Sequence, residues 1–166
     1  MSNQVDHAEI KMGQILTIII AASALVIQEP ALLIPLGIIF LLSGTVRKIS
    51  PFTLLYRYVI RPTGLMRSDY RLDNIQPHKF GQLVGVQTVV IALALIQLGY
   101  PLAGWSVVAI LIVLTMISYA GWCIGCFIYY QLNSFGLGGF FKHPPTDKSV
   151  FMGSRPEKSP DEYTAP

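Results

Sequence analysis

The chain has 166 residues, a mean hydropathy of +0.53 and a formal net charge of +3, and only 13% of its residues are charged. Soluble domains carry about 25% charged residues, so this composition argues against a soluble protein. Two cysteines are too few for a scaffold built on several disulfides. The apolar residues fall in blocks, as in proteins that cross a membrane, and basic residues beside apolar blocks are ordinary topology signals that give nucleic-acid binding no support.

The sequence predicts an all-α membrane protein with one integral membrane domain at residues 12–140. Residues 1–11 form a polar lead, which is not typical of a signal peptide because it carries acidic residues and no cleavage site follows. Residues 141–166 are rich in Pro, Ser and charge, so a disordered cytoplasmic tail is expected. Four transmembrane spans are predicted, at residues 12–28, 31–46, 81–98 and 102–125.

The four spans are predicted to form two helical hairpins. Glu29 and Pro30 turn the chain between the first two spans, because proline disfavours helical geometry in the residue before it. Residues 99–101 turn it between the last two. Both arms of the first hairpin lie at or just below the usual span length of about 17–25 residues, so a re-entrant hairpin is an alternative there.

The connector between the hairpins, residues 47–80, carries seven of the chain's 12 Lys and Arg residues. The two short turns carry none, so the positive-inside rule places the connector and both termini in the cytoplasm of a multi-pass protein of the plasma membrane, the inner membrane in bacteria. Ser50 and Pro51 are a helix-start signal for a short amphipathic helix. This helix either lies in the membrane interface, with Arg57 and Arg61 toward lipid headgroups, or packs on the bundle ends.

Cys123 and Cys126 form a C-x-x-C motif near the cytoplasmic end of the last span. Residues three apart on a helix are close enough to form a disulfide, so a redox pair is geometrically feasible. The expected position, toward the C-terminal end of one helix from 102 to about 132, is unfavourable, because helix N-termini are the ends that stabilise thiolates. The cysteines are therefore either a redox pair activated by connector arginines or small packing residues.

A polar cluster in the second half of the connector either binds a headgroup or partner protein or forms an internal network that fixes the loop. With the two arginines of the connector helix, the candidates for partner or headgroup binding are Arg57, Arg61, Arg71, Asp73, Asn74 and His78. No cofactor is expected. No metal site is expected either, because two thiolates need two further ligands for tetrahedral zinc and the spacing of Asp73 and His78 does not demand a metal.

Two glycine motifs, Gly81-x-x-x-Gly85 and Gly121-x-x-x-Gly125, allow helices to approach closely. They serve either a homo-oligomer face or packing inside the bundle. The spans contain no Asp, Glu, Lys, Arg or His. Because coupled transporters place ionisable groups at membrane depth, ion- or proton-coupled transport is not expected.

An ordered set of motifs resembles a known family. The residues that carry the resemblance are Pro51-Phe52, Leu55-Tyr56-Arg57, Arg61-Pro62, Arg71, Asp73-Asn74, Pro77-His78-x-Phe80, Gly104-Trp105 and Cys123-x-Gly125-Cys126-Phe127-x-Tyr129. Over about residues 12–140 the chain resembles domain of unknown function family 4395, which comprises small bacterial integral membrane proteins without an established activity. Genes for thioredoxin-like and sulfurtransferase proteins are expected nearby in some bacteria, so the resemblance implies a link to thiol or sulfur metabolism and such a protein as partner. By motif match it points to both cysteines and to the polar residues Arg71, Asp73, Asn74 and His78 on the facing loop.

Two functions therefore stand as hypotheses. The first is an accessory protein of thiol-redox or sulfur metabolism that uses a cytoplasm-facing C-x-x-C. The second is a non-catalytic membrane anchor or scaffold whose cytoplasmic loop docks a partner protein. A channel or transporter for a small neutral molecule is the least favoured reading. The sequence leaves open whether the protein is an enzyme.

Overall fold

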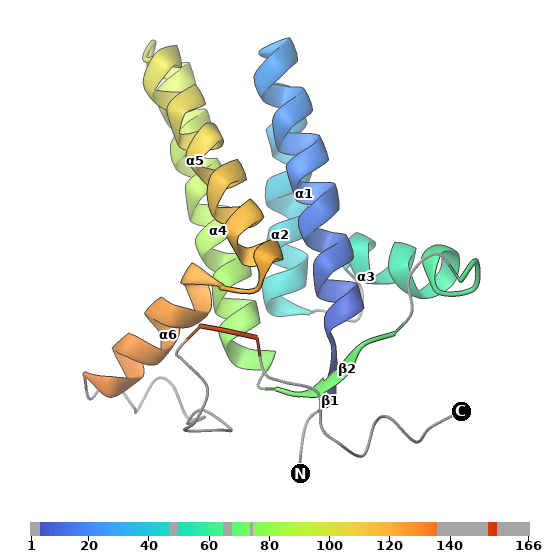
Figure 1. Ribbon diagram of the computed structural model, residues 1–166. Helices are drawn as coiled ribbons and strands as arrows, with labels where there is room; N and C mark the ends of the chain where they lie inside the picture. The colour runs from blue at the N-terminus through green and yellow to red at the C-terminus, as the bar shows by residue number, and fades with distance from the viewer. Residues whose placement is uncertain (1–3, 47–49, 65–67, 74, 136–152, 156–166) are drawn as a thin grey trace.

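The computed structural model describes residues 4–46, 50–64, 68–73, 75–135 and 153–155. Four helices run side by side, and the other elements, except the short turn at residues 30–32, gather at one end of this bundle (Figure 1). In chain order the elements are β1 (Gln4–Asp6), α1 (His7–Ile27), the 3-10 turn η1 (Pro30–Leu32), α2 (Leu33–Thr45), α3 (Pro51–Leu55), the π-helical turn η3 (Tyr56–Ile60), β2 (Tyr70–Leu72), α4 (Ile75–Gln97), α5 (Pro101–Ala120) and α6 (Ile124–Ser134).

Three of the described helices are long and apolar enough to cross a membrane: α1, α4 and α5, with 21, 23 and 20 residues. Each also exposes large apolar side chains; Ile19, Val90 and Ile110 are all more than half exposed, which suits lipid better than water. α2 has 13 residues and is shorter than a usual span even with η1. The helices therefore mark a membrane protein, but the predicted fourth span is not confirmed.

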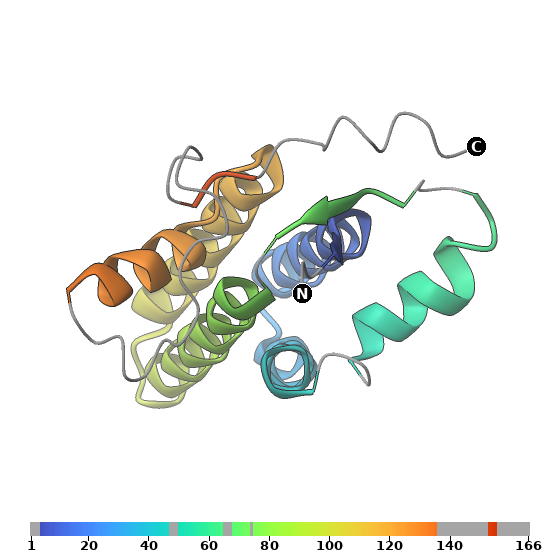
Figure 2. The ribbon, with the colours of Figure 1, turned by 90° about the horizontal axis from the view of Figure 1, so that it is seen from below.

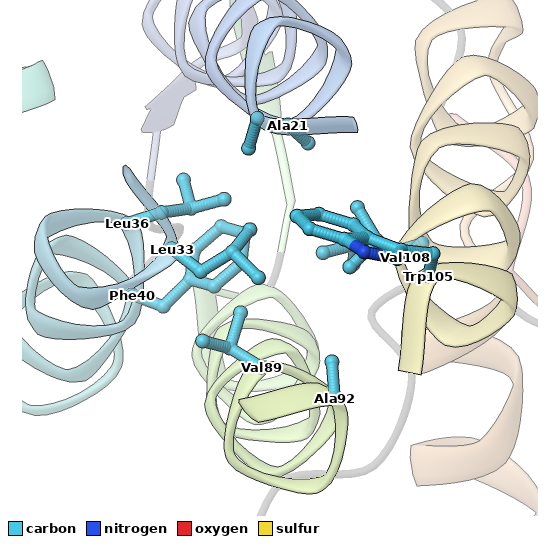
Figure 3. Packing of buried hydrophobic residues seen from close by; sticks show 10 residues of the cluster. Ala21, Leu33, Leu36, Phe40, Val89, Ala92, Trp105 and Val108 are labelled. Carbon is cyan, nitrogen blue, oxygen red and sulfur yellow. The ribbon is translucent and has the colours of Figure 1, made fainter. Parts of the chain in front are cut away.

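Helix packing in the bundle follows the order α2, α4, α5, α1 rather than the order along the chain. α2 packs on α4, α4 on α5 and α5 on α1, whereas α1 and α2 contact each other much less although a short turn joins them. The predicted layout of two hairpins is therefore not confirmed. The core lies between the four helices (Figure 3) and consists of Ala21, Ala24, Leu33, Leu36, Phe40, Val89, Ala92, Trp105, Val108 and Leu111.

The prediction of one helix from residue 102 to about 132 is wrong, because the helix is interrupted between α5 and α6. Gly121 ends α5 with a φ of 118°, in the left-handed region that favours glycine. Trp122 and Cys123 are not helical, and α6 begins at Ile124 and leaves the bundle at an angle (Figure 1). Cys123 therefore stands at the N-terminus of a new helix.

Part of the predicted polar lead is ordered, and it adds one pair of short strands to the predicted helical fold. β1 pairs antiparallel with β2 of the connector, with Val5 opposite Arg71. Figure 2 shows β2 crossing the start of α1. The Asp6 side chain caps α1 by accepting a hydrogen bond from the N–H of Ala8 at 3.0 Å, so α1 begins at His7, ahead of the predicted start at residue 12.

The connector begins with the predicted short helix. Pro51 occupies its first turn, as expected, but Ser50 makes no side-chain cap. The Ser50 hydroxyl lies instead 2.6 Å from that of Ser43 on α2. The start of this helix is therefore tied to the end of α2, while η3 runs outward from the bundle (Figures 1 and 2).

Two hydrogen bonds hold the inner side of this helix against the start of α1. The Thr53 hydroxyl donates to Glu9 Oε1 at 2.8 Å, and the buried Tyr56 hydroxyl donates to Asp6 Oδ2 at 3.0 Å. The connector helix thus packs on the bundle end with one side. Its other side is exposed, which leaves it available to the membrane interface.

Candidate functional site

The C-x-x-C motif occupies the first turn of α6. The backbone N–H of Cys126 donates to Cys123 Sγ at 3.4 Å. The first N–H groups of a helix have no intrahelical partner, and the positive end of the helix dipole lies there, so this position stabilises a thiolate. The objection raised from the sequence, a position near a helix C-terminus, therefore does not apply.

The surroundings divide the two thiols into different roles. A hydrogen bond from Cys126 lowers the pKa of Cys123 to about 6, against the opposing effect of burial, and the nearby His78 adds to the decrease. The same contact, together with burial, raises the pKa of Cys126. Cys126 is buried and Cys123 is partly exposed. The pair therefore combines one partly exposed thiol with a lowered pKa and one buried thiol with a raised pKa.

His78 links the dithiol to the connector. Its Nδ1 lies 3.7 Å from Cys126 Sγ, and its Nε2 lies 2.8 Å from Asp73 Oδ2. The same carboxylate oxygen lies 3.0 Å from Nε2 of His7. Burial opposes ionisation of Asp73, but the polar contacts with the two histidines outweigh it and hold the pKa of Asp73 well below its usual value. Asp73 and His78, both sequence candidates, thus meet at the dithiol.

His7 is a site residue that the sequence reasoning missed. It is the first residue of α1, is only 2% exposed, and packs edge-on against the His78 ring with centroids 5.8 Å apart. Its backbone N–H donates to the carbonyl of Asp69 at 2.8 Å, which ties α1 to the connector. The available signal was Asp6 with Glu9 three residues later, because Asp followed at this spacing by Glu, ahead of an apolar run, is typical of a helix start.

A short piece of the predicted disordered tail is ordered on the C-x-x-C segment. The N–H of Cys123 donates to the carbonyl of Gly153 at 2.8 Å, and the N–H of Arg155 donates to the carbonyl of Gly121 at 2.9 Å. Gly153 has a φ of 87°, and a Cβ there would stand 2.9 Å from the Cys123 carbonyl oxygen. Disorder is therefore wrong for residues 153–155, and the rest of the tail lies outside the described residues.

Glycines bring α6 against α4 at the dithiol. A Cβ on Gly125 would stand 2.7 Å from the Cα of Gly81, so the two backbones touch. The ring of Phe40 occupies the space beside Gly85 in the same way, because a Cβ on Gly85 would stand 2.9 Å from it. These three glycines serve packing inside the bundle, the internal alternative, and a homo-oligomer face is not supported. Gly121 faces open space and serves the helix end instead.

The remaining candidates do not gather at the dithiol. Arg71 forms an ion pair with Asp69 in the connector, with Nη2 and Oδ2 3.0 Å apart. Arg57 and Arg61 are exposed at η3, which lies on the opposite side of the bundle from α6 (Figures 1 and 2). Asn74 lies outside the described residues.

Two cavities adjoin the cysteines. The larger, of about 160 Å³, extends into the bundle from Cys123. Gln14 and Gln82 line it, and their buried Oε1 atoms have no hydrogen-bond partner among the described residues, although Gln14 Nε2 donates to the Ser118 hydroxyl at 2.7 Å. It therefore offers acceptors to a small polar molecule. The smaller cavity, of about 30 Å³, is lined among others by His7, Asp73, His78, Cys123, Cys126 and Arg155.

Comparison with known proteins agrees with the motif resemblance. No curated protein and no solved structure matches the chain. The model of one family, described as a domain of unknown function (DUF4395), matches residues 5–134, a range that covers α1 to α6 and both cysteines. The resemblance predicted from the motifs is confirmed, and the chain belongs to the DUF4395 family.

Proposed function

We propose that this membrane protein performs thiol–disulfide exchange through Cys123 and Cys126 with a soluble thioredoxin-like protein. The observation that carries the proposal is the position of Cys123 directly before α6, where the N–H of Cys126 donates to its Sγ at 3.4 Å. Helix N-termini are the positions at which reactive C-x-x-C thiolates are stabilised. A sulfurtransferase that carries sulfur on a cysteine, as a persulfide, is a second candidate partner, since the Cys123 thiolate can attack a persulfide as it attacks a disulfide.

The proposed exchange has two steps. The Cys123 thiolate attacks one sulfur of the partner's disulfide, a mixed disulfide forms, and the partner's other sulfur leaves as a thiolate. Cys126 then loses its proton, attacks Cys123 Sγ and releases the partner's remaining sulfur as a thiolate. The Cys126 proton passes to one of the partner's two thiolates, and the other takes a proton from solvent. The partner's disulfide is reduced to a dithiol, and the two cysteines of this chain are oxidised to a disulfide. The reverse sequence returns the starting state.

The proposal places the dithiol in the cytoplasm. In this arrangement η1 and α2 form a fourth, short span, which returns the chain to the side of the membrane from which α1 starts. This arrangement is supported by the gathering of the strands, α3 and α6 at one end of the bundle (Figure 1) and by the seven basic residues of the connector. In a bacterium this membrane is the inner membrane.

A second function, a non-catalytic anchor or scaffold, is favoured by the exposed side of the connector helix. Tyr58 is 71% and Val59 49% exposed, beside the exposed Arg57 and Arg61. Apolar and basic side chains on one exposed side are typical of a helix at a membrane interface, with anionic headgroups near its arginines. This surface lies away from the dithiol, so the two functions involve separate residues.

Trapping of the mixed disulfide tests the exchange. The reduced protein in lipid nanodiscs is incubated with the disulfide form of a thioredoxin-like protein and resolved on a non-reducing gel. Cys126→Ser should accumulate the mixed disulfide, because the second step is lost, whereas Cys123→Ser and the double variant should form none. Equal unfolding midpoints of the two single variants are the folding control. Trapping by Cys123→Ser but not by Cys126→Ser would reverse the assigned roles, and no trapping by either would refute the exchange.

A further inference from the structure

We infer that His7, Asp73 and His78 bind one divalent transition-metal ion of the zinc or ferrous class. Each residue offers one ligand atom, and the three atoms all lie within 4.8 Å of one another. Two imidazole nitrogens and one carboxylate oxygen form a donor set that suits zinc and ferrous iron and leaves coordination positions open. This inference goes beyond thiol exchange and does not depend on it.

The spacing of the ligand atoms suits a common central ion. Nε2 of His78 and Nε2 of His7 lie 2.8 and 3.0 Å from the same Oδ2 of Asp73. Ligand atoms bound about 2.0–2.2 Å from a tetrahedral zinc ion stand about 3.3–3.6 Å apart, so the two histidine nitrogens would move roughly 0.5 Å away from the carboxylate oxygen to form a metal shell.

The ring of His7 lies close to the carboxylate of Asp73 but is not oriented for a hydrogen bond to it. Its Nε2 is buried and makes no hydrogen bond of acceptable geometry among the described residues, despite the 3.0 Å separation from Asp73 Oδ2. A buried ring nitrogen without such a bond is costly unless another atom satisfies it. A metal ion beside the carboxylate would satisfy it.

There is room for an ion at this point, and the ligands are held by separate elements. The cavity of about 30 Å³ is lined by all three residues, and this volume suffices for a metal ion with a water molecule. His7 follows the Asp6 cap of α1, Asp73 directly follows β2, and His78 lies in the first turn of α4. The pairing of β1 with β2 brings the first two together.

The surroundings also connect the metal to the dithiol. Bound through Nε2, His78 would carry its ring proton on Nδ1, which faces Cys126 Sγ at 3.7 Å; such a contact on the second nitrogen is how metal-bound histidines are oriented. Arg155 lines the same cavity and opposes a cation, whereas the carboxylate of Asp73 favours one. Because the positive charge of Arg155 repels a bound metal ion, we expect moderate rather than high affinity.

The test uses a chain without thiols, so that no metal is held by cysteine. Full-length Cys123→Ser/Cys126→Ser protein in nanodiscs is stripped with a chelator and titrated with Co²⁺, read by visible absorption, and with Zn²⁺, read by elemental mass spectrometry. We expect one equivalent to bind, and we expect His7→Ala or the closer-fitting His7→Gln to weaken binding about tenfold or more. His143→Ala, which changes the chain's third histidine, is the matched control and should bind like its parent.

The outcomes separate this inference from thiol exchange. Binding of less than a tenth of an equivalent, or equal binding by the His7 variants and their parent, would overturn the metal site. Neither result affects trapping by Cys126→Ser. Conversely, a chain that fails to trap a partner is still expected to bind the metal, because the double variant used here has no thiols.

Discussion

At the scale of single residues, Cys123 combines partial exposure with a stabilised thiolate. The groups that face its sulfur are Cys126, which donates to it, Ser118, which also lowers its pKa, and the nearby His78. Because these effects lower the pKa of Cys123 to about 6, most of this residue is thiolate at pH 7. Its reactivity should therefore persist at pH values at which an ordinary cysteine is protonated.

The pH dependence of alkylation measures this property. The rate of Cys123 alkylation by iodoacetamide, followed by peptide mass spectrometry, should rise through a midpoint near pH 6 and fall as the thiolate is protonated below it. Cys126→Ala removes the donor thiol and should move the midpoint upward, toward the ordinary cysteine value of about 8.5. In Cys123→Ser the remaining Cys126 should react slowly at neutral pH. A midpoint of 8 or above in the unmodified protein would contradict the assignment.

Sequence reasoning located most of the site at this scale and failed at identifiable residues. The two cysteines, Asp73 and His78 were candidates from the motif and the family resemblance. His7 was assigned to a loose lead, because only the pairing of β1 with a connector strand distant in the sequence orders that segment. The contact of Gly153 with Cys123 is equally non-local, and no periodicity marks it.

At the scale of elements, the contact of α6 with α4 sets the position of the dithiol. The two glycines at this contact differ in the space around them. A Cβ on Gly125 would stand 2.7 Å from the Cα of Gly81, whereas a Cβ on Gly81 would have its nearest contacts at 3.8 and 3.9 Å, the latter with Cys123 Sγ. One side of the contact therefore accepts a methyl group and the other does not.

Alanine substitutions at the two glycines test this asymmetry. Gly125→Ala should lower the free energy of unfolding by roughly 1–3 kcal/mol, because the backbones must separate, and should disturb Cys123 alkylation. Gly81→Ala is the matched control at the same contact and should stay close to the unmodified protein in both measurements. Thermal unfolding in nanodiscs gives the comparison, and equal effects of the two substitutions would contradict the described packing.

The helices themselves were largely predictable, whereas the break between α5 and α6 was not. Apolar runs located α1, α2, α4 and α5, and Pro51 marked the connector helix. The apolar run continues through residue 121, so the hydrophobic pattern does not show where α5 ends. Gly121 was interpreted with Gly125 as a packing motif, although its positive φ makes it a helix end. That misreading reversed the expected effect of the helix dipole on the cysteines.

At the scale of the whole molecule, one end of the bundle carries the polar elements. β1, β2, α3 and α6 lie there, and the turns after α1 and α4 lie at the other end (Figure 1). If η1 and α2 cross the membrane, Glu29 and Tyr100 face the outside and Arg61 faces the cytoplasm. All three side chains are exposed and so are suitable labelling positions.

Single cysteines in the Cys123→Ser/Cys126→Ser background test this topology. A membrane-impermeant maleimide added to intact cells should label Glu29→Cys and Tyr100→Cys, and should label Arg61→Cys only after permeabilisation. Labelling of Tyr100→Cys but not Glu29→Cys in intact cells would instead show that α1 and α2 form the re-entrant hairpin. Labelling of Arg61→Cys in intact cells would contradict the cytoplasmic connector.

The proposed exchange requires Cys123 and Cys126 to cycle between dithiol and disulfide in the membrane of living cells. Differential alkylation measures this directly: free thiols are blocked by acid quench and a light maleimide, disulfides are then reduced, and the new thiols receive a heavy maleimide. We predict a population in which both cysteines carry the heavy label together; this population should grow after brief treatment with diamide and decline on recovery. Two cysteines that stay light under every condition, diamide included, would contradict it.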